Sequence, residues 1–180
     1  MVYMLLGAGF EETEAIAPLD LLRRAEIPVL TVGLNDKTVF GGHGIGVEAD
    51  ITIEQMDLTQ LDMIVIPGGL GGVAAIRASQ PALDAIRFAF ENSKYVAAIC
   101  AGPTILAQLH ITDNKNVTCY PGCEESMGSA ITHADVPCVQ DGTVITGASA
   151  GCAVSFGLAL IWALKGEEAA QKVAKQIVIR

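Results

Sequence analysis

The chain has 180 residues, of which 51% are hydrophobic and 17% are charged. This composition is typical of a globular protein with a large buried core, and it excludes a disordered chain. The formal net charge of −9 argues against nucleic acid and anionic membranes as partners, because both are negatively charged themselves.

The first half of the chain alternates short apolar runs with helical patterns. An apolar run at residues 2–6 predicts a strand, and apolar spacing over residues 11–25 predicts a helix. The residues expected on the apolar face of that helix are Ile16, Leu19, Leu22 and Ala25. Further apolar runs predict strands at 28–33 and 62–66, and a second amphipathic pattern predicts a helix at 81–92.

The second half begins with the same alternation and then changes. Residues 95–99 predict a buried strand, residues 103–109 a helix, and residues 116–119 a short strand. Residues 136–145 contain Asp141-Gly142, which is typical of a hairpin turn. Two further helices are predicted at residues 152–164 and 167–176.

These elements predict an α/β fold. Near-continuous apolar strands that alternate with helices indicate a mostly parallel sheet with helices on both faces. The chain contains no repeat, linker or low-complexity segment, so we expect a single domain over residues 1–180.

One uncharged segment, residues 144–164, is long enough to span a bilayer. It begins, however, with the small-residue run 147–151, which is typical of a loop, and the remainder has the length of a buried core helix. We therefore expect a core helix at residues 152–164 and no membrane span.

Cys100 stands where the strand at 95–99 meets the helix at 103–109. Small residues lie two places before and two places after it (Ala98 and Gly102), which is the pattern of a nucleophile elbow. We expect this turn to expose the thiol at a helix N-terminus, which would lower its pKa. The alternative is a buried structural cysteine.

Two more loops are expected at the same edge of the sheet as Cys100. Residues 67–69 follow the third strand and residues 7–14 follow the first, and ligands of such sheets bind beyond the carboxyl ends of the strands. Gly7-Ala8-Gly9 is a weak dinucleotide signal, because it lacks the third glycine and is followed by acidic residues.

Three motifs occur in order along the chain: GFEETE at residues 9–14, PGG at 67–69 and AAICAGP at 97–103. Together they resemble the ThiJ/PfpI superfamily, in particular the branch of the parkinsonism-associated redox protein deglycase and its bacterial relatives. The resemblance extends over nearly the whole chain. It implies a flavodoxin-like three-layer sandwich, usually homodimeric, with a reactive cysteine at the elbow.

The resemblance also implies roles for particular residues. Cys100 matches the nucleophile and Glu14 its acidic partner, and the backbone N–H groups of Gly69 and Ala101 match the oxyanion pocket. The other residues expected to line the pocket are Gly68 and Tyr120. A carboxyl group buried beside a thiolate is pushed to its neutral form, so a protonated Glu14 can donate a hydrogen bond to the sulfur. The alternative for Glu14 is a first-turn acid that complements a helix dipole.

The chain departs from the family at three places. Relatives of the human-like branch have histidine before a proline where this chain has Tyr120, and protease-like relatives have histidine where it has Ala101. Residues 147–151 replace a run that contains an arginine. Without these histidines we expect no peptidase activity. His43, His110 and His133 match no family site.

The chain has five cysteines, an odd number without paired zinc spacing: Cys100, Cys119, Cys123, Cys138 and Cys152. With no signal-peptide pattern at residues 1–4, this favours a reducing cytoplasm. One interpretation of Cys119 is a resolving thiol for oxidised Cys100. The alternative is that Cys119 is a small apolar residue and that Cys123 is a thiol in a loop. We expect no metal and no cofactor.

The leading hypothesis is a cysteine-dependent enzyme of the glyoxalase or deglycase type. Its substrates would be small reactive carbonyl compounds or their adducts on protein side chains, attacked by Cys100. The alternative is a redox-sensing stress protein or chaperone in which Cys100 is oxidised to sulfinic acid. A third possibility is a binding domain without catalysis.

Overall fold

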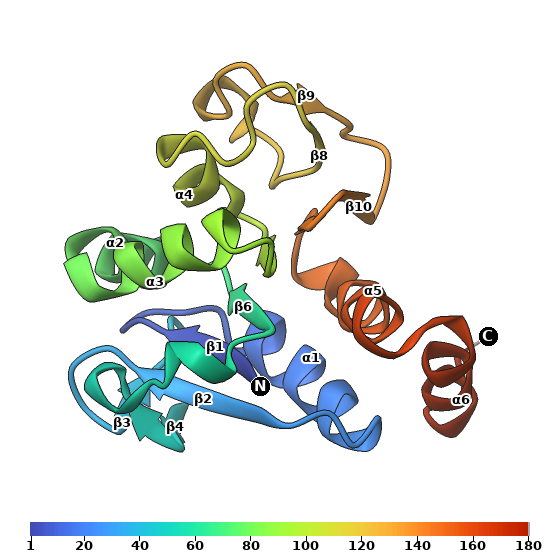
Figure 1. Ribbon diagram of the computed structural model, residues 1–180, viewed down its shortest axis with the longest axis horizontal. Helices are drawn as coiled ribbons and strands as arrows, with labels where there is room; N and C mark the ends of the chain where they lie inside the picture. The colour runs from blue at the N-terminus through green and yellow to red at the C-terminus, as the bar shows by residue number, and fades with distance from the viewer. Residues whose placement is uncertain (180) are drawn as a thin grey trace.

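The computed structural model describes residues 1–179 and is built around a seven-stranded sheet (Figure 1). The strands of this sheet are β1 (Val2–Leu6), β2 (Val29–Gly33), β5 (Ile51–Thr52), β6 (Met63–Ile66), β7 (Tyr95–Ile99), β10 (Cys138–Asp141) and β11 (Val144–Gly147). Their order is β10-β11-β7-β6-β1-β2-β5. All neighbours are parallel except the β10–β11 hairpin. The predicted mostly parallel sheet is confirmed.

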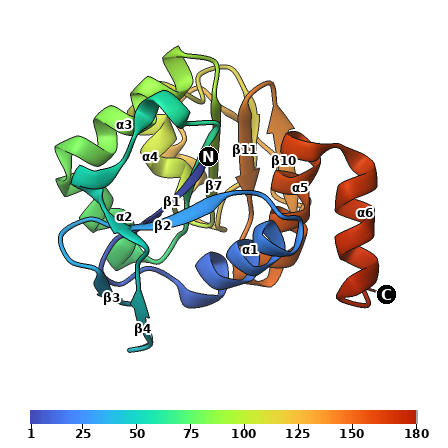
Figure 2. The ribbon, with the colours of Figure 1, turned by 60° about the horizontal axis from the view of Figure 1, so that its bottom comes forward.

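Helices cover both faces of this sheet, which gives three layers (Figure 2). The helices are α1 (Glu12–Arg24), α2 (Leu70–Ala78), α3 (Gln80–Glu91), α4 (Pro103–Gln108), α5 (Ala153–Lys165) and α6 (Glu167–Gln176). In Figure 2, α1, α5 and α6 lie on one side of the sheet, and α2, α3 and α4 lie on the other. The predicted three-layer α/β sandwich is therefore confirmed.

The two sides of the sheet form two apolar cores, as the pleat of a strand requires. In β1, Val2, Met4 and Leu6 face the core that contains α1 and α5. Tyr3 and Leu5 face the opposite core, which contains α2, α3 and α4. Because β1 is buried on both faces, its sequence is apolar throughout and does not alternate with polar residues.

Smaller elements lie outside the main sheet. Two pairs of short strands are β3 (Thr38–Phe40) with β4 (Gly46–Glu48), antiparallel, and β8 (Asn116–Val117) with β9 (Ile131–Thr132), parallel. Single turns of 3₁₀-helix are formed by Ile53–Gln55, Leu58–Gln60, Glu124–Ser126 and Ala150–Cys152. The β3–β4 hairpin, β5 and α2 were not predicted, because their short or glycine-rich sequences lack a clear apolar period.

Two sequence-based expectations about helices are resolved by the structure. The apolar face predicted for α1 is partly wrong: Ile16 is 40% exposed, whereas Glu12 and Glu14 are buried. The uncharged segment at residues 144–164 folds as β11, a 3₁₀ turn and the 13-residue α5. Among residues 1–179, no helix combines the length and apolar character that a membrane crossing requires.

Candidate active site

Cys100 lies in a sharp turn between β7 and α4, as the elbow pattern predicts. Its φ of 65° is in the left-handed region, which costs energy for a residue with a side chain. The turn is held on both sides: the Cys100 N–H donates to Gly147, and its carbonyl accepts from Tyr120, each at 2.9 Å. A Cβ at Gly102 would lie 2.9 Å from the Ile66 carbonyl oxygen, so only glycine fits two places after the cysteine.

Glu14 reaches the elbow from the first turn of α1. Its side chain is fully buried, and its Oε2 accepts the Gly68 N–H at 2.8 Å. The carboxyl group lies beside the Cys100 side chain, since a Cβ built at Gly68 would contact both Glu14 Oε2 and Cys100 Cβ. Its other oxygen, Oε1, is buried without an N–H or O–H partner among the described residues. A carboxyl group with so few donors is stabilised in its protonated form.

Glu14 and Cys100 perturb each other's ionisation. Burial raises the pKa of Glu14 to about 7. Burial, followed by the neighbouring Glu14 carboxylate, raises the pKa of the Cys100 thiol to about 12. The expected lowering of the thiol pKa is therefore wrong: α4 has only six residues, and its N-terminus does not outweigh burial and a facing carboxylate.

The two groups are close enough to titrate as one pair. The pair loses its first proton near the pKa of Glu14, and the second proton leaves only at far higher pH. When Glu14 holds the remaining proton, its charge no longer opposes the thiolate. A nucleophilic sulfur in this site therefore requires a neutral Glu14.

Two backbone N–H groups also point at the sulfur. The amides of Ala101 and Gly69 lie near Cys100 Sγ, and both lower its pKa. Gly69 has φ 84°, and a Cβ there would lie 2.6 Å from the Glu11 amide nitrogen. At Gly68, a Cβ would collide with the Glu14 carboxyl group. Glycine at position 68 lets the 67–69 loop approach the elbow, and glycine at position 69 lets it approach the backbone of residues 9–11.

Tyr120 lies beside the elbow through its backbone, and its side chain is 50% exposed. No histidine in the described part of the chain contacts Cys100. His43 contacts Glu12, His110 contacts Asp113, and His133 contacts Asn116. The groups near the Cys100 sulfur are thus one carboxyl group and two backbone amides, and no imidazole base lies there among the described residues.

A cluster that the sequence did not indicate lies on the other side of α1. Oxygen and nitrogen atoms of Glu11, Glu12 and His43 lie within 4.8 Å of one another, a spacing that suits a metal ion. Glu12 already accepts the His43 N–H and contacts His43 Nδ1, both at 2.8 Å, and it also accepts the Ile45 N–H. These bonds fix the β3–β4 hairpin to α1.

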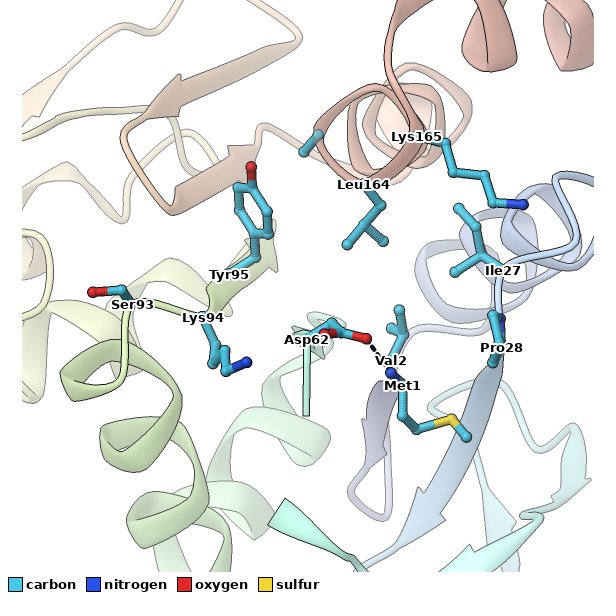
Figure 3. Close-up of a pocket in the computed structure, with 11 residues that line it drawn as sticks. Met1, Val2, Ile27, Pro28, Asp62, Ser93, Lys94, Tyr95, Leu164 and Lys165 are labelled. Atoms are coloured by element: carbon cyan, nitrogen blue, oxygen red, sulfur yellow. Dashed lines mark hydrogen bonds and ion pairs between the residues drawn. The ribbon is translucent and has the colours of Figure 1, made fainter. Parts of the chain in front are cut away.

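A cavity of about 480 Å³ lies away from Cys100, at the amino ends of β1, β2, β6 and β7 (Figure 3). Figure 3 shows Val2, Ile27 and Leu164 on one side and Lys94 and Tyr95 on the other. None of the predicted site residues lines this cavity, so the elbow remains the candidate active site.

The DJ-1/PfpI family pattern matches residues 1–163 of this chain. DJ-1beta of Drosophila melanogaster is 34% identical over 178 residues, which cover 98% of this chain and 95% of that protein. Its crystal structure gives a TM-score of 0.94 at 34% identity, and the match covers 99% of this chain and 97% of that one.

Two further relatives bear on chemistry. A deglycase from Pyrococcus horikoshii is 30% identical over 146 residues, which cover 81% of this chain and 87% of the deglycase. The structure of oxidised DJ-1 from Toxoplasma gondii gives a TM-score of 0.92 at 27% identity, covering 98% of this chain and 97% of that one. On these matches, which span nearly its whole length, the chain belongs to the DJ-1/PfpI family and is a homologue of its DJ-1 branch.

Proposed function

We propose that this protein is a cysteine-dependent enzyme that acts on small reactive carbonyl compounds or their adducts on protein side chains. The observation that carries the proposal is the buried Glu14–Cys100 pair, which is set in a strained elbow under the amides of Gly69 and Ala101. The name of the Pyrococcus relative, a deglycase, supports the same class of reaction.

The first step follows from the positions of these groups. The Cys100 thiolate attacks the carbonyl carbon, a C–S bond forms, and the carbonyl π electrons move to oxygen. The Gly69 and Ala101 N–H groups stabilise the resulting oxyanion, and Glu14 transfers its proton to it. The product is a neutral hemithioacetal, and Glu14 is left as a carboxylate that can accept a proton in the next step.

The missing histidine limits this chemistry. Peptide hydrolysis needs a base for the nucleophile and an acid for the leaving amine, and neither Tyr120 nor Ala101 supplies an imidazole. Addition of the thiolate to a carbonyl group requires fewer proton transfers than peptide hydrolysis. The single proton on Glu14 is sufficient to neutralise the oxyanion. The proposal is therefore slow glyoxalase or deglycase turnover without peptidase activity.

Methylglyoxal turnover of wild type, Cys100→Ser and Cys138→Ser tests the proposal. Cys138 is a matched control: it is also half-buried, and burial raises its pKa to about 12 as well, but it has no carboxyl partner. We expect Cys100→Ser to lose turnover by about a thousandfold or more, since it removes the nucleophile. Equal loss in both variants, or no loss in Cys100→Ser, would contradict the proposal.

Tyr120→His tests the role of the missing base. If the geometry resembles that of histidine-bearing relatives, the substitution raises methylglyoxal turnover by about tenfold or more, the scale of general base catalysis. A lower rate would show that Tyr120 itself takes part in the reaction.

A second candidate function is redox sensing or chaperone activity in oxidative stress. Oxidation of Cys100 to a sulfinate would place negative oxygens where Glu14 and two amides already offer hydrogen bonds. The oxidised Toxoplasma relative is in keeping with this chemistry. A wild type that turns over no methylglyoxal but forms a stable sulfinate at Cys100 would favour this function.

We also propose a homodimer in the cytoplasm that uses the surface of α1 and the β3–β4 hairpin. Ile16 on α1 and Phe40 and Ile45 on the hairpin are exposed apolar side chains. Within one chain Asp20 already pairs with Arg24 at 2.6 Å, so apolar contact would contribute more than ion pairs across the two-fold axis. Light scattering that gives a monomer mass at micromolar concentrations would contradict the dimer.

A further inference from the structure

A tight turn at residues 120–123 follows β8, with one cysteine directly before it and another as its last residue. Pro121 and Gly122 occupy its central positions, Gly122 has φ 94°, and the Cys123 N–H donates to the Tyr120 carbonyl at 2.9 Å. This is the pattern of a type II β-turn, which brings its first and last Cα atoms within about 7 Å. Cys119 directly precedes the turn and Cys123 is its last residue, and both cysteines pack in one apolar cluster.

Both thiols belong to one small apolar cluster. Cys119 is 5% exposed and packs with the buried side chains of Val117 and Met127, and Cys123 is half-buried against the same cluster. The sulfur of Cys100, by contrast, has contacts with Glu14, Gly69 and Ala101. Cys123 is thus the thiol that shares an apolar cluster with Cys119.

The two thiols differ in exposure and in charged neighbours. The Arg77 guanidinium lies near Cys123 and favours its thiolate, although burial and Glu124 raise the pKa of Cys123 overall. Arg77 is held in place by a 2.6 Å hydrogen bond from its Nη2 to Thr104 Oγ1. For Cys119, burial raises the pKa to about 11, and no cation offsets it. Cys123 is therefore the thiol that solvent and an oxidant reach first.

We propose that Cys119 and Cys123 form a reversible intramolecular disulfide when the protein is exposed to a peroxide. The Cys123 thiolate attacks one peroxide oxygen, the O–O bond breaks, and a sulfenic acid and water result after protonation. Cys119 then attacks the Cys123 sulfur, the S–S bond forms, and the S–O bond breaks with loss of a second water. Two thiols are oxidised by two electrons, and the peroxide is reduced to two waters.

This site is separate from the proposed function, because no step involves Cys100. The reaction is slow at neutral pH and accelerates above it, since burial disfavours both thiolates. The cysteine pair is thus a redox modification site close to the elbow. The backbone hydrogen bond from the Tyr120 N–H to the Cys100 carbonyl joins the turn to the elbow.

Peptide mapping tests the proposal on wild type and Cys100→Ser. Each protein is treated with hydrogen peroxide, its remaining thiols are alkylated, and it is cleaved after Lys115 and after Glu124. The resulting peptide 116–124 contains Cys119 and Cys123 and no other cysteine. We expect this peptide to be unalkylated and lighter by two hydrogens in both proteins, and to be alkylated at both cysteines after prior treatment with dithiothreitol.

A peptide 116–124 that stays alkylated at both cysteines after peroxide would overturn the proposal, and so would a disulfide between Cys119 and Cys100. Cys100→Ser separates this outcome from the proposed enzyme function, because that variant lacks the candidate nucleophile but keeps the turn. A disulfide that forms in Cys100→Ser as it does in wild type supports the inference, whether or not turnover is lost. Loss of turnover in that variant without the disulfide would support the enzyme proposal and overturn the inference.

Arginine variants test the assigned order of attack. Arg77→Gln removes the cation near Cys123, and we expect disulfide formation to slow by roughly threefold or more, because less thiolate is present. Arg87→Gln is the matched control, since Arg87 is an exposed arginine on α3 whose ion-pair partner is Asp84. Equal rates in the two variants would contradict the role of Cys123 as the attacking thiol.

Discussion

A glutamate is buried on each side of the first turn of α1, yet the pKa values of the two side chains shift in opposite directions. On the hairpin side, burial raises the pKa of Glu12. Hydrogen bonds from the His43 ring and from backbone N–H groups lower this pKa by more than burial raises it, and the result is about 2. On the elbow side, Glu14 accepts one amide, from Gly68, and burial raises its pKa to about 7. The number of donors, and not burial alone, decides which acid is ionised.

This difference separates a structural acid from a chemical one. Glu12 is an ionised side chain that holds the β3–β4 hairpin. Both of its carboxylate oxygens have hydrogen-bond partners in residues 43–45. Glu14 keeps an oxygen without an N–H or O–H partner and titrates near neutral pH, which is the behaviour expected of a proton donor in catalysis. The following predictions compare the two sides directly.

The largest expected difference is in turnover. Glu14→Gln removes the transferable proton and should lower methylglyoxal turnover by about 10²–10⁴-fold, the usual contribution of general acid–base catalysis. Glu12→Gln, its matched control two residues away, should leave turnover per folded molecule unchanged. The pKa of Cys100 in Glu14→Gln should also fall below about 12, because the facing charge is gone, and the pH dependence of iodoacetamide labelling measures it. An unchanged rate in Glu14→Gln would contradict the assignment of Glu14.

The pH dependence of stability should differ in sign. The folded pKa of Glu14 lies above its ordinary value of 4.5, so its contribution is complete below pH 4.5 and is lost as the pH rises to about 7. That loss is on the order of 3 kcal/mol in the free energy of unfolding. Glu12 acts in reverse: its contribution is present above pH 4.5 and is lost as the pH falls towards 2.

Urea unfolding of wild type and Glu14→Gln between pH 4 and pH 8 checks this difference. Wild type should lose stability relative to the variant as the pH rises through the range from 4.5 to about 7. Parallel profiles for the two proteins would show that Glu14 does not keep its proton in the folded state.

Two glycines with nearly the same backbone angle compare the two sides again. Gly69, at the elbow, has φ 84°, and a Cβ there would lie 2.6 Å from backbone atoms. Gly44, in the hairpin turn, has φ 80° and nothing within 4 Å of its Cβ position. Gly69→Ala should cost about 3 kcal/mol or more, and Gly44→Ala about 1 kcal/mol, because only the first adds a clash to the backbone strain. Equal losses in thermal unfolding would mean that the 67–69 loop does not approach the backbone of residues 9–11 this closely.

The smallest expected effect concerns His43. His43→Ala removes the ring contact with Glu12 but leaves the two backbone N–H donors in place. We expect faster amide hydrogen exchange in the hairpin turn at residues 41–45, with no change at the elbow. Faster exchange at residues 99–102 would show that the two sides of α1 are coupled.

The sequence indicated much of this site because its signals are local. An apolar run before Cys100 predicts the strand that leads to the elbow. Small residues around Cys100 and the PGG motif predict tight turns, because their small side chains leave room for the backbone to approach closely. The family motifs added Glu14. The roles of Cys100, Glu14, Gly69 and Ala101 and the single-domain organisation remain predictions, and the variants of Cys100, Glu14 and Gly69 test the first three roles.

Patterns along the chain by themselves determined the central strands β1, β2, β6 and β7, the helices α1, α3, α4, α5 and α6, and the position of the elbow, since these depend on neighbouring residues. Only the tertiary structure decided how many donors each buried group receives. Glu12 and Glu14 look alike in the sequence, but residues 43–45 supply N–H groups to the first, and Gly68 and Cys100 face the second. The raised pKa of Cys100 has the same origin, because burial and a facing carboxylate come from segments far apart in the chain.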